Sequence, residues 1–124
     1  KDKSSYELVR FSTANDCRVV GIFGKLLKTF IKDNRTHLLV SYADKRWSPR
    51  LNNLYDKTGF TMVKETQPNY WYVKKYNRIH RFNFTKQKLI KLGYDKNKTE
   101  KQIMSDLKYD RIWDCGHFRY EMKF

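Results

Sequence analysis

Apolar residues alternate between two spacings along the first half of the chain, and these spacings predict its first elements. A short apolar run at 17–22 is interrupted by Gly21 and predicts a strand that ends in a turn. Apolar positions then recur three and four residues apart through Phe30 and Ile31, which predicts an amphipathic helix. The run 37–42 is short and apolar, as in a strand buried on both faces. Strand, helix and strand in this order predict a β-α-β unit with parallel strands.

Two further elements flank this unit. Upstream, 6–12 reads as a strand that turns back at 13–16 into the strand 17–22, as in a hairpin. Downstream, Ser48 and Pro49 predict the start of a second helix, because serine is favoured as an N-cap and proline at the first helical position. Gly59 predicts its end.

The pattern changes to strict alternation in the second half of the chain. Residues 60–64 and 70–74 read as an antiparallel hairpin. Two short helices are predicted next, over 85–92 and from Thr99 to about residue 107, the second opened by the capping-box sequence Thr-Glu-Lys-Gln. The tail, 111–122, reads as a closing hairpin. The whole pattern predicts a mixed α/β domain.

Two motifs in the first half resemble a known family. The segment Arg18-Val-Val-Gly-Ile-Phe-Gly24 precedes the first helix, and Asn53-Leu-Tyr-Asp-Lys-Thr-Gly-Phe60 follows the central strand. Together they resemble the second half of the GCN5-related N-acetyltransferase (GNAT) fold, over residues 6–75. The resemblance implies one GNAT-like domain over 1–124, with a core at 1–75 and a basic, aromatic extension at 76–124. It also implies a mixed central sheet with helices on both faces and a C-terminal helical and hairpin extension.

The same resemblance implies an acetyltransferase as one functional alternative. In that family the loop before the helix holds the pyrophosphate of acetyl-coenzyme A and a tyrosine donates a proton, which assigns the proton donor to Tyr55. The corresponding loop residues are Arg18, Gly21, Gly24 and Lys25. Phe23 stands where the family has glycine or alanine, and a bulky side chain there obstructs close approach of the backbone to a phosphate. We therefore expect no cofactor and leave the acetyltransferase as an alternative.

A longer pattern resembles a module of phage proteins, often found behind an HNH-type nuclease segment in homing endonucleases. It runs from Tyr42 through Pro68-Asn-Tyr-Trp-Tyr-Val73 to Ile112-Trp-Asp-Cys-Gly116. The resemblance implies a DNA-targeting module of a phage or mobile-element protein, in the cytoplasm of a bacterial host, with a nuclease domain as its partner.

Net charge narrows the classes of partner. Twenty-seven Lys and Arg against thirteen Asp and Glu give a formal charge of +14, which attracts polyanions, nucleic acid first. A lysine-rich proteome is the alternative explanation. No apolar run approaches membrane-spanning length, so no membrane partner is expected. Cys17 and Cys115 lack metal-ligand spacing, and no metal site is expected.

The cations are interleaved with rings and amides over 74–88, as a nucleic-acid surface requires. Arg46 and Trp47 are two more candidates for binding nucleic acid, because they follow the central strand at the end where open α/β sheets bind ligands. The alternative is an ordinary basic strand whose rings face the core. The predicted nucleic-acid-binding residues are Arg46, Trp47, Lys74, Lys75, Tyr76, Arg78, His80, Arg81, Lys86 and Lys88.

A metal-dependent nuclease is the second enzyme alternative. Asp114 followed by Glu121 and Lys123 has the order of an acid and Glu-x-Lys triad, which would take a divalent metal. Such patterns are common by chance, so we expect no catalysis within this chain. The sequence predicts a nucleic-acid-binding module, with duplex DNA as its ligand.

Overall fold

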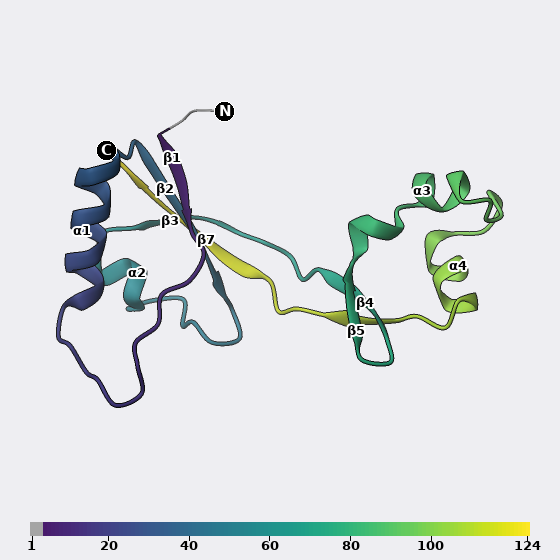
Figure 1. Cartoon of the computed structure of the whole chain (residues 1–124), viewed down its shortest axis with the longest axis horizontal. Coiled ribbons are helices and arrows are strands. Elements are labelled where there is room, and N and C mark those ends of the chain that lie inside the picture. The colour runs from purple at the N-terminus through teal and green to yellow at the C-terminus, as the bar shows by residue number, and fades with distance from the viewer. Residues whose placement is uncertain (1–3) are drawn as a thin grey trace. The chain divides into compact units, whose positions relative to one another are not determined.

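The structure is a computed structural model, and it describes residues 4–124. Figure 1 shows its helices and strands in chain order. The expected mixed α/β class is confirmed. The elements are β1 (Ser5–Leu8), α1 (Ile22–Asn34), β2 (Leu38–Asp44), α2 (Leu54–Lys57), β3 (Thr61–Glu65), β4 (Tyr70–Lys74), β5 (Asn77–His80), the 3₁₀ helix η1 (Arg81–Phe84), α3 (Lys86–Lys91), α4 (Glu100–Asp106), β6 (Asp110–Trp113) and β7 (His117–Lys123).

The chain divides into two compact units. The inserted unit is Pro68–Cys115, and the host unit is the chain up to Gln67 together with Gly116–Phe124. The inserted unit thus interrupts the host unit between β3 and β7. The sequence pattern predicted one domain, with a core and an extension that meet between residues 75 and 76. The structure instead divides the chain after Gln67 and after Cys115.

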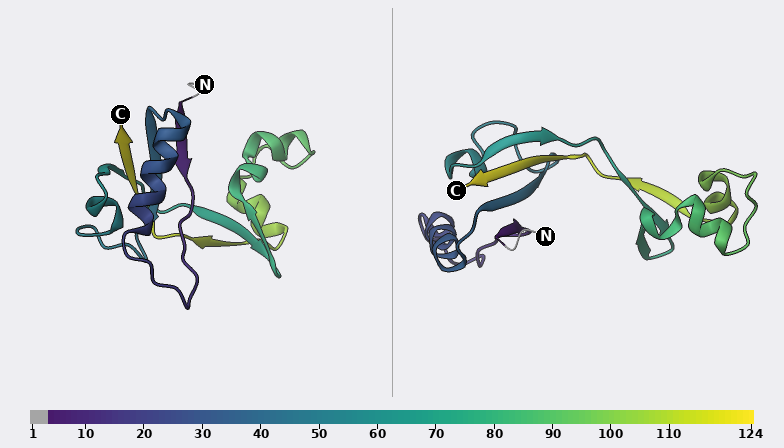
Figure 2. Two further views of the ribbon diagram at one scale, coloured as in Figure 1. Left: turned by 60° about the vertical axis from the view of Figure 1, so that its left-hand side comes forward. Right: turned by 90° about the horizontal axis from the view of Figure 1, so that it is seen from above.

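The host unit is a four-stranded sheet in the order β1-β2-β7-β3. β1 pairs with β2 in parallel, and the other pairs are antiparallel. α1 packs along β1 and β2, as the views in Figure 2 show. Side chains of both helices join one core cluster on one face of the sheet, rather than covering both faces as expected. This cluster contains Phe23, Leu27, Leu39, Ala43, Phe60, Phe118 and Tyr120, with Tyr55 packed against it.

The predicted β-α-β unit exists, but β1 is its first strand and no strand forms at 17–22. The expected hairpin of 6–12 with 17–20 is therefore wrong. Val20 is 86 % exposed, so this apolar run has no packing partner in the host unit to hold it extended. Gly21 then adopts φ 71 as the N-cap of α1, a left-handed conformation that glycine tolerates best.

The second helix is shorter than predicted and has a different cap. It begins after Asn53, whose side chain accepts hydrogen bonds from the backbone N–H groups of Tyr55 and Asp56 in a capping box. Ser48 is not the N-cap. Asn52 takes φ 59, which interrupts helical backbone just before the observed start. The side chain of Asn53 thus sets the start of the helix, rather than Ser48 and Pro49.

The inserted unit is a three-stranded antiparallel sheet in the order β5-β4-β6. Its core lies between this sheet and the helices α3 and α4, and it consists of Tyr72, Leu89, Ile103 and Met104. β4 pairs with β5 and β6, while β3 and β7 pair in the host unit, so the two hairpins expected over 60–74 and 111–122 are wrong. Both corrections follow from the insertion, because strands adjacent in sequence belong to different units.

Candidate nucleic-acid interface

The inserted unit holds the longest acid-free stretch of the chain. Residues 66–94 contain seven Lys or Arg and no Asp or Glu. Over the whole inserted unit there are twelve Lys or Arg against five Asp or Glu. Because no carboxylate within this stretch offsets its cations, the local field attracts anions more strongly than the average composition indicates.

One face of the β5-β4-β6 sheet is not covered by any helix of the inserted unit. The strand register places Trp71 opposite His80 and Ile112, and Val73 opposite Arg78 and Asp110. Tyr72 points to the other face, where the core lies. We call the uncovered side the open face, and it consists of Trp71, Val73, Arg78, His80, Asp110 and Ile112.

Rings and a guanidinium group pack together on the open face. The Arg78 guanidinium lies 4.1 Å from the centroid of the Trp71 ring. The His80 ring meets Trp71 edge-on at 4.6 Å between centroids and continues to Phe82 at 4.8 Å. Phe82 is 58 % exposed. The face therefore presents flat π-surfaces and one cation to any ligand in solution.

Three of the predicted binding cations are occupied by contacts inside the inserted unit. Each of them donates to an oxygen of its own unit: Lys74 Nζ to Leu107 O at 2.7 Å, Arg81 Nη1 to Asn69 Oδ1 at 2.9 Å, and Lys88 Nζ to Phe82 O at 2.6 Å. Lys74 also lies over the Tyr109 ring, and Arg81 over the Tyr70 ring. These cations hold the fold as well as contributing charge.

Other cations of this stretch are exposed and make no side-chain contact within residues 4–124. They are Lys75, Lys86 and Lys91. Lys75 and Tyr76 form the two-residue loop of the β4–β5 hairpin, and Tyr76 is fully exposed. Lys91, Trp71, Phe82 and Ile112 were not among the predicted site residues. The alternation of 70–74 was the signal for Trp71, because it places Trp71 and Tyr72 on opposite faces.

Arg46 and Trp47 belong to the host unit, and the other eight predicted binding residues belong to the inserted unit. They follow β2 in a turn where the backbone N–H groups of Arg46 and Trp47 donate to Asp44 Oδ1 and Asp44 O, at 2.8 and 3.1 Å. Trp47 is 78 % exposed, so it does not pack in the core of the host unit.

Phe23, which was expected to obstruct the anion loop, turns its ring into the core. It is buried, and its ring contacts Phe11 at 4.8 Å between centroids. Gly24 lies inside α1, and a Cβ added there would meet no atom within 4 Å. Arg18 and Lys25 are exposed beside this loop. Phe23 and Phe11 still line the small hollow beside Gly21 and Gly24, so aromatic residues border the start of α1.

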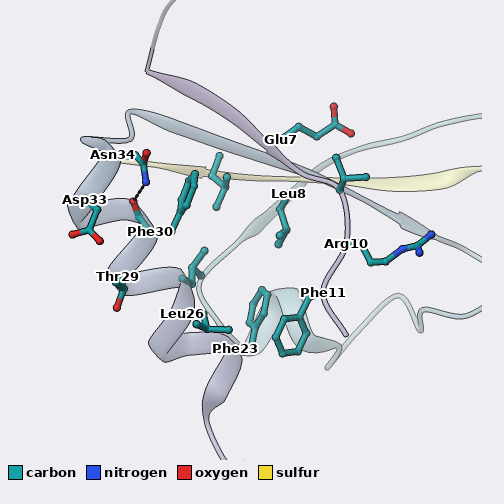
Figure 3. A pocket seen from close by; sticks show the side chains of 13 residues that line it. Glu7, Leu8, Arg10, Phe11, Phe23, Leu26, Thr29, Phe30, Asp33 and Asn34 are labelled. Carbon is teal, nitrogen blue, oxygen red and sulfur yellow. Dashed lines mark hydrogen bonds between the residues drawn. The ribbon is translucent and has the colours of Figure 1, made fainter. Parts of the chain in front are cut away.

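Two hollows adjoin α1 in the host unit. The smaller, about 360 Å³, lies beside Gly21, Gly24 and Leu54. The larger, about 730 Å³, opens between α1 and the chain at 7–11, and Figure 3 shows Phe11, Phe23 and Leu26 at its wall. Apolar side chains form most of the larger wall, with Glu7, Arg10 and Asp33 among its polar members.

Tyr55 lies in the packed interior of the host unit. Its ring stacks on Tyr120 at 4.7 Å between centroids, and its hydroxyl oxygen is 3.0 Å from Ser41 Oγ. Ser41 Oγ is also 2.8 Å from Leu8 O, which can only accept. The single Ser41 proton therefore goes to Leu8, and Tyr55 donates its own proton to Ser41.

The three residues of the nuclease pattern lie in different units. Asp114 is in the inserted unit, where it accepts from the Asn69 N–H at 2.8 Å. Glu121 is on β7 of the host unit and pairs with Arg119 at 2.6 Å and with Lys123 at 3.6 Å. From Ser4 to Phe124 there is no group of three His, Cys, Asp or Glu placed to hold a metal ion. Over the same range no helix is long and apolar enough to cross a membrane.

A half-buried carboxylate fixes the helical side of the inserted unit to its sheet. Glu100 Oε1 accepts from the Tyr72 hydroxyl at 2.7 Å and from the Tyr70 hydroxyl at 3.0 Å. Burial, and then the hydrogen bond to Glu100, raise the pKa of Tyr72 well above its ordinary value of 10.0. Tyr72 thus stays a neutral donor at every physiological pH, and β4 stays anchored to α4 beneath the open face.

Comparison with models of known protein families found no match, and a search of curated proteins found none either.

Proposed function

We propose that this chain is a nucleic-acid-binding module whose contact surface lies on the inserted unit, with duplex DNA as a ligand. The observation that carries the proposal is the acid-free stretch 66–94, which carries exposed cations on the β4–β5 hairpin and on α3 together with the ring and guanidinium group of the open face. Cations neutralise phosphates without reading sequence, and a set of them spread over a surface suits a polyanion.

The setting of this surface supports the proposal. The open face is held from beneath by the core of Tyr72, Leu89, Ile103 and Met104, so its strands form a fixed platform. Lys75 is at the tip of the β4–β5 hairpin, and Lys86 and Lys91 are at the two ends of α3. Exposed lysines on two elements give several points of contact along a phosphate backbone. Action in the cytoplasm of a phage-infected bacterium, beside a partner nuclease domain, is part of the same proposal.

The acetyltransferase is kept as a second candidate because the Phe23 ring is buried in the core and a hollow lies beside Gly21 and Gly24. Against it, the proton of Tyr55 is directed to Ser41 in the interior. Acetyl-coenzyme A at a hundred times its dissociation constant stabilises a folded protein by about 2.7 kcal/mol. The acetyltransferase requires a shift of this size in the melting temperature, and the proposed function requires none.

The proposed function predicts electrostatic binding with a steep dependence on salt. If about five to eight cations contact phosphates, the plot of log K against log salt for duplex DNA has a slope of about −4 to −7. Fluorescence anisotropy of a labelled duplex, titrated with the whole chain over a salt series, measures this slope. A slope near zero, or no binding at low salt, would contradict the proposed function and leave a lysine-rich proteome as the explanation of the positive charge.

A further inference from the structure

Apolar surface on and beside the open face is larger than phosphate binding requires. The Phe82 ring, beside the face, is 58 % exposed, and the aliphatic Ile112 within it is 43 % exposed, while the rings of Trp71 and His80 are half-buried. Phosphates are bound by cations and N–H groups, and a duplex keeps its bases stacked away from flat side chains. The Phe82 ring and the half-buried rings next to it therefore suit a ligand of another kind.

The arrangement of these groups matches the requirements of an unpaired base. Trp71, His80 and Phe82 follow one another in a row at centroid distances of 4.6 and 4.8 Å, with the His80 plane at 86° to Trp71 and at 40° to Phe82. The Arg78 guanidinium caps one end of this row at 4.1 Å from Trp71 and offers a flat, charged surface of its own. Bases of single strands stack on such rings and on guanidinium planes.

Charge on the same side suits the backbone of a single strand. The open face holds one carboxylate, Asp110, and the neighbouring hairpin tip carries Lys75. Stacked bases and neutralised phosphates are the two parts of a single-strand groove. The intramolecular alternative is that Arg78, Trp71 and His80 stabilise only each other, but this leaves the exposure of Phe82 and Ile112 unexplained.

We propose that the open face, with Phe82 beside it, is a stacking site for unpaired bases, so that the chain prefers nucleic acid with a single-stranded segment over a blunt duplex. This inference rests on the proposed function, and it names the ligand structure that the same surface selects. The row of rings gives the preference, while the exposed lysines of the same unit give the general affinity.

The test compares a blunt DNA duplex with the same duplex carrying a single-stranded thymidine tail of about ten nucleotides. We expect the wild-type chain to bind the tailed duplex about tenfold more tightly, because each stacked base contributes about 1 to 3 kcal/mol. Phe82→Ala should remove most of that ratio and change the affinity for the blunt duplex less than about twofold. Phe82 is exposed, so this substitution leaves the core unchanged.

Tyr94→Ala is the matched control, because Tyr94 is an exposed ring of the same unit that follows α3 rather than lying on the open face, and it is not among the predicted binding residues. It should leave the ratio of the two affinities unchanged. Equal wild-type affinities for the two ligands, or an equal effect of Phe82→Ala on both, would overturn the stacking site while leaving the proposed function intact. Absence of binding to either ligand would overturn both.

Discussion

Replacing the four cations Lys75, Arg78, Lys86 and Lys91 with glutamine should reduce the salt slope of duplex binding by about 3 to 4, because each lost phosphate contact removes about 0.9. Three of these side chains have no hydrogen bond, ion pair or ring interaction within residues 4–124, and the Arg78 guanidinium lies over the Trp71 ring. The fold should therefore remain. Salt-series anisotropy measures the slope, and circular dichroism checks the fold.

The matched control replaces four lysines of the host unit, Lys25, Lys28, Lys32 and Lys57, which are also exposed. It removes the same charge from the chain. We expect the slope to change by less than about 1, since charges that are not in contact release few counterions. If the control reduced the slope as much as the first set does, the assignment of binding to the inserted unit would be wrong.

Tyr72→Ala should unfold the inserted unit selectively. Tyr72 is fully buried at the centre of that core, and removing a buried aromatic side chain costs about 3 to 5 kcal/mol. The change also leaves the Glu100 carboxylate without its shorter hydrogen bond. For a unit of 48 residues this loss is comparable to the whole stability. Hydrogen exchange should therefore show lost protection over 70–113.

Protection in α1, β2 and β7 should persist in that variant, since the host unit has a separate core. DNA binding should be lost together with the inserted unit. Tyr76→Ala is the control for stability, with an expected change in the free energy of unfolding within about 0.5 kcal/mol for an exposed side chain. Simultaneous loss of protection in both units would show that they fold cooperatively as one. That result would contradict the expectation that each unit is stabilised by its own core.

Elements fixed by local signals were predicted well. The amphipathic spacing that predicted the first helix matches α1, and the apolar run 37–42 matches β2. The capping box at Thr99 is confirmed, with Thr99 Oγ1 accepting from the Gln102 N–H at 3.2 Å. These signals depend on residues within a few positions of one another, so they can be read from the sequence alone.

Strand pairing was not predicted, because it depends on contacts far apart in the chain. β4 reads as the partner of β3, yet it pairs with β5 and β6, and β3 pairs with β7 across the whole insertion. An alternating pattern specifies a strand and its faces but does not identify its neighbour. The division into host and inserted units follows from those pairings, so it could not be seen in the pattern either.

The candidate site was predicted in part. Its location in the basic, aromatic stretch after residue 74 follows from composition. Composition does not reveal which cations of the stretch are already engaged in the fold. Lys74 and Arg81 are engaged because folding brings Leu107 O and Asn69 Oδ1 within their reach. Lys75 and Lys86 have no such acceptor within residues 4–124. Phe23 likewise packs with residues distant in sequence, such as Leu39 and Phe118, which local pattern does not reveal.

Hydrogen exchange, measured with and without a DNA duplex carrying a single-stranded tail, maps the contact surface and so tests whether the inserted unit binds DNA. We expect slower exchange on binding within 74–91 and unchanged exchange in α1, Ile22–Asn34. Slowing confined to the host unit, with 74–91 unaffected at saturating DNA, would contradict this expectation.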